Sequence, residues 1–178
     1  MLPHDFKTTE DFYRIGKSSK ISNDQDKQTL ISLRKAADLI VTTGRTARDE
    51  SYRGSRHAPI AVLTKNPETL ADLELFTSAK GNFTIDCDTT ELGVCLSTKI
   101  AEKGFSSPLF EGGLGTLKAL AHGLNKLELV LSITGSPAPE ELTPGFYVDA
   151  ILPGMTVSEL KTTALGGNLV IQASLIRQ

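Results

Sequence analysis

Two glycine-bearing stretches of the chain have the residue types needed to bind a phosphate group. In the later one, residues 108–120, a short apolar run breaks into glycines and resumes with helical spacing, which predicts a strand, a turn and a helix. The first turn of such a helix offers free N–H groups and the positive end of the helix dipole to an anion. Because Gly112 and Gly113 have no side chains, a ligand could approach their backbone closely.

The same stretch also fits a tight strand-to-helix connection in which glycine serves only turn geometry and close packing. It matches neither of the common phosphate-binding patterns, GxGxxG and GxxxxGK[ST]. Taken alone, it leaves both interpretations open.

The earlier stretch follows residues 39–42, a β-branched apolar run typical of a strand buried on both faces. Ligands of α/β proteins bind at the carboxyl ends of such strands. Arginine can bind a phosphate through two hydrogen bonds, and Thr46 could cap the next element and donate to a phosphate oxygen. Alternatively, the two arginines pair with Asp49 and Glu50 on a solvated turn. The candidate residues of this turn are Thr43, Gly44, Arg45, Thr46 and Arg48.

The surrounding pattern predicts four successive strand-then-helix units, which implies a mostly parallel sheet covered on both faces. Their strands are expected at residues 39–42, 59–64, 83–87 and 107–110. A helix at residues 24–37 precedes the first strand, and further helices are expected at 66–70, 92–103 and 116–122. An antiparallel meander then follows, with strands at residues 127–132, 145–150, 157–162 and 169–174. Before these units come a loosely held tail, residues 1–9, and a short strand at residues 12–16.

Length and composition predict one globular domain, residues 1–178, because a chain of 178 residues is too short for two large cores. The net charge of −2 supplies no basic surface for nucleic acid. No segment has the length of a membrane span, so we expect a cytoplasmic protein without a membrane partner. Cys87 and Cys95 lack the spacing of a metal knuckle, and we expect reduced, partly buried thiols and no metal.

The order of these motifs resembles the reductase family related to dihydrofolate reductase, specifically the C-terminal pyrimidine reductase of bacterial riboflavin biosynthesis and its stand-alone relatives. That family has a Leu-Arg-x-x-Ala-Asp helix end, a buried strand and a Gly-x-Gly-Thr-x-Arg-like turn, matched here by residues 33–38, 39–42 and 44–48. It then has Glu-Gly-Gly-Pro-x-Leu, a helix ending at Gly-Leu and an Asp-Glu-Leu strand, matched by residues 111–117, 123–124 and 125–129. The resemblance covers residues 21–136.

This resemblance implies a three-layer α/β/α fold with a mostly parallel twisted sheet that ends in antiparallel strands. It also implies that NADPH lies across the carboxyl ends of the strands, with Thr46 facing the cofactor phosphates. Glu111 would orient the second phosphate loop or touch the ligand, and the loop itself would be lined by Gly112, Gly113, Leu114 and Gly115. On grounds of charge alone, Arg45 and Arg48 are candidates for the 2′-phosphate that separates NADPH from NADH.

The function that follows is an NADPH-dependent reductase, which transfers hydride to a small heterocyclic or sugar-like substrate and which we expect to be a homodimer. No residue is assigned as the catalytic acid. The riboflavin reductases carry a Ser-x-Asp-Gly-Lys segment after their first strand, and residues 16–22 have no matching carboxylate. A non-catalytic nucleotide-binding protein with a lapsed substrate site is therefore the alternative, and an unrelated α/β protein without a cofactor is a third.

Overall fold

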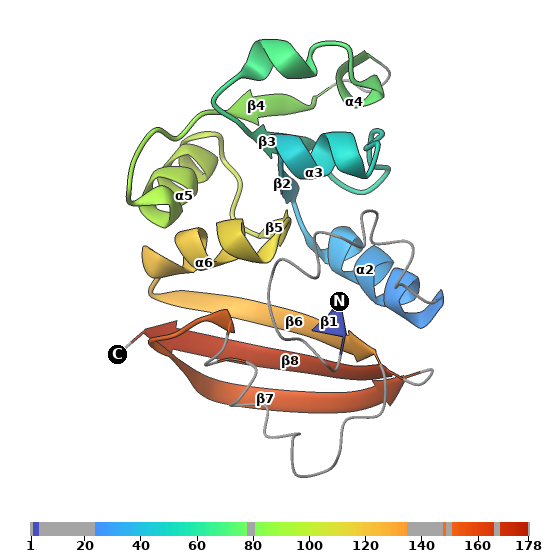
Figure 1. Ribbon diagram of the computed structural model, residues 1–178, viewed down its shortest axis with the longest axis vertical. Coiled ribbons are helices and arrows are strands. Elements are labelled where there is room, and N and C mark those ends of the chain that lie inside the picture. Colours follow the sequence, from blue (N-terminus) through green and yellow to red (C-terminus); the bar gives the residue numbers. More distant parts are fainter. Residues whose placement is uncertain are drawn as a thin grey trace. The chain divides into compact units, whose positions relative to one another are not determined.

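The computed structural model describes residues 2–3, 24–77, 81–134, 148, 151–165 and 168–177 (Figure 1). Its contacts divide the chain into two compact units, Gln28–Gly123 and the combination of Met1–Lys27 with Leu124–Gln178. The single domain stays a prediction. The strand expected at residues 12–16 lies outside the described residues.

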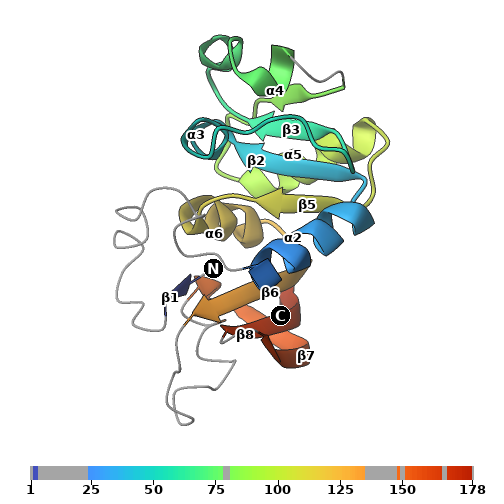
Figure 2. The ribbon, with the colours of Figure 1, turned by 90° about the vertical axis from the view of Figure 1, so that its right-hand side faces the viewer.

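The unit Gln28–Gly123 is built on a parallel sheet of four strands. In chain order these strands are β2 (Leu39–Thr43), β3 (Ile60–Leu63), β4 (Phe83–Ile85) and β5 (Pro108–Glu111). In the sheet the order is β4-β3-β2-β5, and Figure 2 shows the strands following one another in this order. The four predicted strands and their parallel arrangement are confirmed.

Helices cover both faces of this sheet, because alternate residues of its central strand point to opposite sides. Leu39 and Val41 belong to a core cluster with the buried residues of α5 (Leu92–Glu102) and α6 (Leu114–His122). Ile40 belongs to a second cluster, with α3 (Gly44–Asp49), the 3₁₀ helix η2 (Pro67–Leu70) and α4 (Glu74–Thr77). The predicted three-layer α/β/α architecture is thus confirmed within this unit (Figure 1).

Asp38 connects the starts of the two strands that later position the candidate site. Its carboxylate accepts hydrogen bonds from the backbone N–H of Ser106 at 2.7 Å and of Ser107 at 3.0 Å. The bond from Ser106 is the main reason that the pKa of Asp38 lies below its usual value. Asp38 directly precedes β2 and the two serines directly precede β5, so this carboxylate holds the two strands in register from their amino ends.

The other unit contains an antiparallel sheet of β6 (Lys126–Thr134), β7 (Met155–Leu165) and β8 (Asn168–Arg177). The short strand β1 (Leu2–Pro3) adds to β6 in parallel, so these two residues of the predicted loose tail are paired. The sheet order β1-β6-β8-β7 places the last strand in the middle. Antiparallel C-terminal strands were therefore predicted correctly, but they do not follow one another as in a meander.

The strand predicted at residues 145–150 is wrong at Val148, its described residue, whose backbone is helical. The N–H of Leu152 donates to the carbonyl oxygen of Val148 at 2.6 Å, which is the spacing of an α-helical turn. Val148, Ile151 and Leu152 are all buried, and this spacing of apolar residues suits one face of a helix.

The expectation of two reduced thiols is also wrong, because Cys87 and Cys95 form a disulfide. Cys87 follows β4 and Cys95 lies in the first turn of α5, and the return of the helix onto the sheet brings their Cα atoms to 6.1 Å. That separation lies within the usual range for a disulfide. The described residues contain no cluster that could hold a metal ion. None of the helices described is long and apolar enough to cross a membrane.

Reduction of this disulfide should destabilise the fold. The bond closes a loop across a sequence separation of 8 residues, which should contribute about 2–3 kcal/mol by restricting the unfolded chain. For a chain of this length we expect the melting temperature to fall by roughly 4–12 °C in reductant, as measured by thermal unfolding. The double variant Cys87→Ala, Cys95→Ala should melt at the temperature of the reduced protein, with or without reductant. An unchanged melting temperature after complete reduction would contradict the assignment.

Candidate functional site

The two predicted turns lie side by side at the carboxyl ends of two neighbouring strands of the parallel sheet. β2 and β5 are neighbours, and their carboxyl ends are aligned because Thr42 is the register partner of Glu111. From β2 the chain adds β3 and β4 on one side of the sheet, and then returns to add β5 on the other side. This change of direction makes the gap between β2 and β5 a topological switch point, the place where open α/β sheets bind their ligands. The two predicted turns thus meet at such a point.

The first turn is capped by Thr43, whereas the sequence suggested Thr46 for that role. The side-chain oxygen of Thr43 accepts a hydrogen bond from the backbone N–H of Thr46 at 3.1 Å, and α3 begins at Gly44. The Thr43 hydroxyl also lies 2.9 Å from the Thr46 hydroxyl. One of the N–H groups that α3 could offer to an anion is therefore already bound within the protein.

The two arginines of this turn have different surroundings. Arg45 lies on the exposed side of α3, where its Nε is 3.4 Å from a carboxylate oxygen of Asp49. The Nη1 of Arg48 instead donates to the hydroxyl of Thr69 at 3.4 Å. The alternative of a solvated turn with internal ion pairs thus describes Arg45, but not Arg48.

In the second turn, α6 begins at Leu114, two residues earlier than predicted. Leu114 and Gly115 therefore belong to the first helical turn and not to a loop. Gly113 is the N-cap residue, with φ −70° and ψ 154°, and as a glycine it has no side chain to cap the N–H groups of that turn. The carbonyl oxygen of Gly113 accepts the N–H of Leu117 at 3.0 Å. Because α6 lacks a side-chain cap, its N–H groups are more available to an anion than those of α3.

Gly112 has a packing role that the sequence did not reveal. A Cβ atom placed on this residue would lie 2.5 Å from Cζ of the Phe110 ring, far inside van der Waals contact. The ring is itself packed against the core cluster of α5 and α6. The absence of a side chain at Gly112 thus makes room for Phe110. This agrees with the interpretation in which the glycine serves close packing.

Glu111 is held by two residues from other elements. Arg34, on α2 (Asp24–Ala36), donates from Nε to one carboxylate oxygen at 2.7 Å and from Nη2 to the other at 2.5 Å. The hydroxyl of Tyr52 donates to the second oxygen at 2.7 Å. The Arg34 guanidinium also lies 5.7 Å from the centre of the Tyr52 ring. Of the two possibilities predicted for Glu111, these contacts support orientation of the loop.

The electrostatics around Arg34 and Tyr52 keep each of these two side chains in one protonation state. The hydrogen bonds from Arg34 to Glu111 raise the pKa of Arg34 further above its already high value. Burial, reinforced by the neighbouring Glu111 carboxylate, raises the pKa of the Tyr52 phenol well above its usual value. Tyr52 therefore remains a neutral hydrogen-bond donor at physiological pH. We call these residues, Arg34, Tyr52 and Glu111, the Glu111 cluster.

Sequence reasoning assigned no site role to Arg34 or Tyr52. Arg34 belongs to the Leu-Arg-x-x-Ala-Asp motif, so its position was a usable signal. Tyr52 lies 59 residues before Glu111, and nothing in the local pattern around it indicates the contact.

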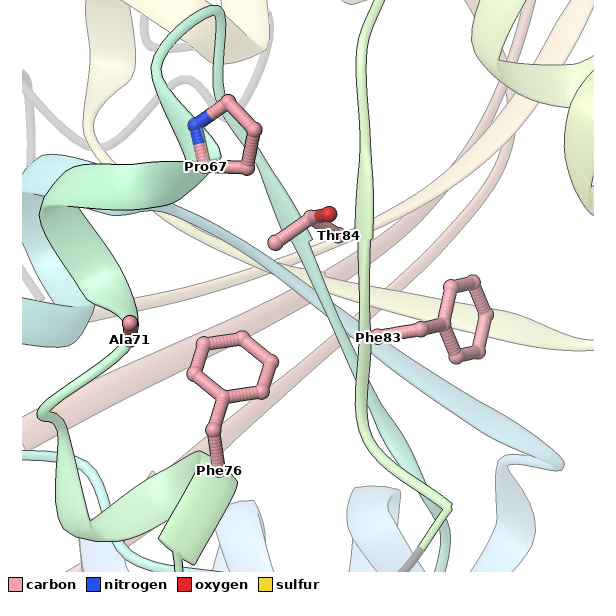
Figure 3. A pocket seen from close by; sticks show the side chains of 5 residues that line it. All are labelled: Pro67, Ala71, Phe76, Phe83 and Thr84. Atoms are coloured by element: carbon pink, nitrogen blue, oxygen red, sulfur yellow. The ribbon is translucent and has the colours of Figure 1, made fainter.

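A pocket of about 380 Å³ lies away from this edge, beside β4 at the end of the parallel sheet (Figure 3). Phe76 points into it, whereas Phe83 points to the other side of β4, where its ring stacks on Phe105 at a centroid distance of 6.1 Å. The lining residues are Pro67, Ala71, Phe76, Phe83 and Thr84. None of them is charged, so the pocket does not suit a phosphate, and we place the candidate site at the switch point.

Comparison with known proteins gives similarity in structure alone. No family model and no curated protein matches the chain. A pyrimidine reductase-like protein from Corynebacterium diphtheriae aligns over 92% of this chain and 86% of its own, with a TM-score of 0.60 and 18% identity. The riboflavin biosynthesis reductase Rib7 of Saccharomyces cerevisiae aligns over 86% of this chain and 81% of its own, with a TM-score of 0.57 and 15% identity.

Dihydrofolate reductase from Enterococcus faecalis, in complex with NADP(H), aligns over 85% of this chain and 82% of its own. Its TM-score is 0.52 and its identity is 12%. The chain therefore has the dihydrofolate-reductase-like fold, and the predicted resemblance is confirmed as a shared fold. Two of these neighbours are named as reductases, and the third as pyrimidine reductase-like.

Proposed function

We propose that the protein is an NADPH-dependent reductase that transfers hydride to a small heterocyclic or sugar-like substrate. The observation that carries the proposal is the position of the two predicted turns at one topological switch point, between β2 and β5. The reductases that share the fold add support, and one of them is a complex with NADP(H).

The residues at this edge fit a dinucleotide phosphate. α6 is preceded by Gly113, which has no side chain to cap it, so its first N–H groups can bind phosphate oxygens. The first turn supplies the Thr46 hydroxyl and, on the side of β3, the Arg48 guanidinium. We assign the pyrophosphate chiefly to Gly113, Leu114 and Gly115, because one N–H of the other turn is already bound by Thr43.

The bound cofactor would supply the hydride, and the protein would supply binding and orientation. The Glu111 cluster holds the turn between β5 and α6 from two other elements, and so fixes the direction in which the first N–H groups of α6 point. Both oxygens of Glu111 are occupied by this cluster. Glu111 is therefore a positioning residue, and we assign it no proton transfer.

One observation favours the alternative of a non-catalytic nucleotide-binding protein. The carboxylate next to the glycines is committed to Arg34 and Tyr52, and the raised pKa of Tyr52 makes this phenol a poor acid. A lapsed enzyme could keep the phosphate turns and this cluster while lacking a proton donor for a substrate. Binding and turnover therefore have to be measured separately.

The first experiment is a thermal-shift titration of the purified protein with NADPH and with NADH. Saturable binding should raise the melting temperature, because a ligand at a hundred times its Kd stabilises the folded state by about 2.7 kcal/mol. If neither nucleotide raises the melting temperature at millimolar concentration, the reductase proposal fails. Loss of nicotinamide absorbance with a panel of pyrimidine and pteridine substrates would identify an enzyme. Binding without turnover would favour the non-catalytic alternative.

A further inference from the structure

The side chain of Arg48 lies over the carboxyl ends of β2 and β3, at the edge of the candidate site. A Cβ atom placed on Gly44 would lie 3.6 Å from Nη1 of Arg48 and 3.3 Å from the hydroxyl oxygen of Thr64. Gly44 directly follows β2, and Thr64 directly follows β3. The ends of the two strands are aligned, because Thr43 and Leu63 are register partners. The guanidinium thus returns from the end of α3 to its beginning, and it lies on the side of the switch point away from β5.

Arg48 differs from neighbouring cations of the same unit in having no acidic partner within the described part of the chain. Arg45 pairs with Asp49, Arg53 with Glu74 and Lys65 with Asp88. The protein contact described for Arg48 is a long hydrogen bond of 3.4 Å to the Thr69 hydroxyl. That hydroxyl donates its own proton to the carbonyl oxygen of Asn66 at 2.8 Å, so it can accept from Arg48 but does not neutralise it.

The surroundings of Arg48 suit a phosphate group. The Thr64 hydroxyl oxygen accepts the backbone N–H of Asn66 at 3.1 Å, which fixes its place and leaves its own proton to donate. An exposed guanidinium with free N–H groups can bind two oxygens of a phosphate monoester at once. Gly44 provides the space between these two groups, since a side chain there would crowd both.

We propose that Arg48, and not Arg45, binds the phosphate monoester that distinguishes NADPH from NADH. This inference rests on the proposed function, because it takes a dinucleotide at the switch point as given. Arg45 is assigned no contact with that phosphate, because it lies on the exposed side of α3 in an ion pair with Asp49. Arg48 is thereby the residue that sets the preference between the two cofactors.

The test measures the Kd values of NADPH and NADH for Arg48→Ala, Arg45→Ala and Arg53→Ala by nicotinamide fluorescence, each variant having lost one positive charge. Arg48→Ala should raise the Kd of NADPH by about tenfold to a hundredfold and change the Kd of NADH by less than about threefold. The Arg45 variant should keep the ratio of the two Kd values, and so should Arg53→Ala, whose side chain pairs with Glu74 away from the turn. In Arg48→Lys, which keeps the charge but not the planar fork, NADPH affinity should be intermediate.

Competition by 2′,5′-ADP and by 5′-AMP isolates the phosphate from the nicotinamide. Wild-type protein should prefer 2′,5′-ADP, and Arg48→Ala should lose that preference. Equal loss of NADPH and NADH affinity in Arg48→Ala, or a changed ratio in Arg45→Ala alone, would overturn the assignment while leaving the reductase proposal intact. Absence of binding of either cofactor to the wild-type protein would overturn both. Thermal unfolding should show that each variant is folded and melts at the wild-type temperature. If Arg48→Ala is unstable, the Kd values of Arg48→Lys provide the test instead.

Discussion

Replacement of Glu111 by glutamine should destabilise the protein by about 3 kcal/mol, the low end of the range for breaking a buried ion pair. The side chain of Glu111 is 9% exposed and that of Arg34 is 26% exposed, so Glu111→Gln leaves a largely buried positive charge without its partner. The shape of the side chain is kept, which separates the loss of charge from the loss of volume. For this chain length we expect a fall in melting temperature of roughly 6–12 °C, measured by thermal unfolding.

Glu74→Gln is the matched control, because Glu74 forms an ion pair with Arg53 in which both side chains are more than half exposed. The same chemical change there should cost less than about 1 kcal/mol. In the double variant Arg34→Met, Glu111→Leu, much of the lost stability should return, since both charges are then absent. If Glu111→Gln and Glu74→Gln prove equally mild, the Glu111 cluster does not hold the turn, and its positioning role is refuted.

Replacement of Gly113 by valine should weaken nucleotide binding by on the order of a hundredfold, or about 2.7 kcal/mol. The backbone of Gly113, at φ −70° and ψ 154°, is in the extended region that any residue adopts. The new side chain should therefore cost at most about 1 kcal/mol of stability, as a poor N-cap residue. The valine side chain would nevertheless lie in the path by which the phosphate approaches the N–H groups of α6. Fluorescence titration with NADPH measures the loss, and thermal unfolding without ligand measures the stability.

The neighbouring glycine gives the opposite expectation. In Gly112→Ala the new methyl group meets the Phe110 ring, and the forced repacking should cost about 1–3 kcal/mol of stability. Stability and binding should thus separate at adjacent positions. Retention of wild-type NADPH affinity by folded Gly113→Val would remove the second turn from the phosphate site. It would leave the packing role of Gly112 unaffected.

Much of the layered unit was predictable because its signals are local. Residues 39–42 are apolar and β-branched throughout, which is typical of a strand buried on both faces, and β2 is such a strand. The strand-then-helix alternation likewise predicted the parallel sheet. The C-terminal part was harder, since spacing in sequence does not state which strands pair. β8 lies between β6 and β7, and Val148 proved helical where a strand was expected.

Within the candidate site, the sequence determined which residue types are present and in which order: two turns with glycine, each after an apolar strand, with arginines in the first of them. It could not determine what each side chain contacts, because those contacts join residues from different elements of the fold. Glu111 meets a guanidinium 77 residues earlier in the chain, and Cys87 meets Cys95 only because α5 folds back onto the sheet. The tertiary structure also separated the two glycines and the two arginines, which look equivalent in sequence. Phe110 occupies the space beside Gly112, and among the described residues an acid pairs with Arg45 but not with Arg48, because packing and charge pairing depend on neighbours in space.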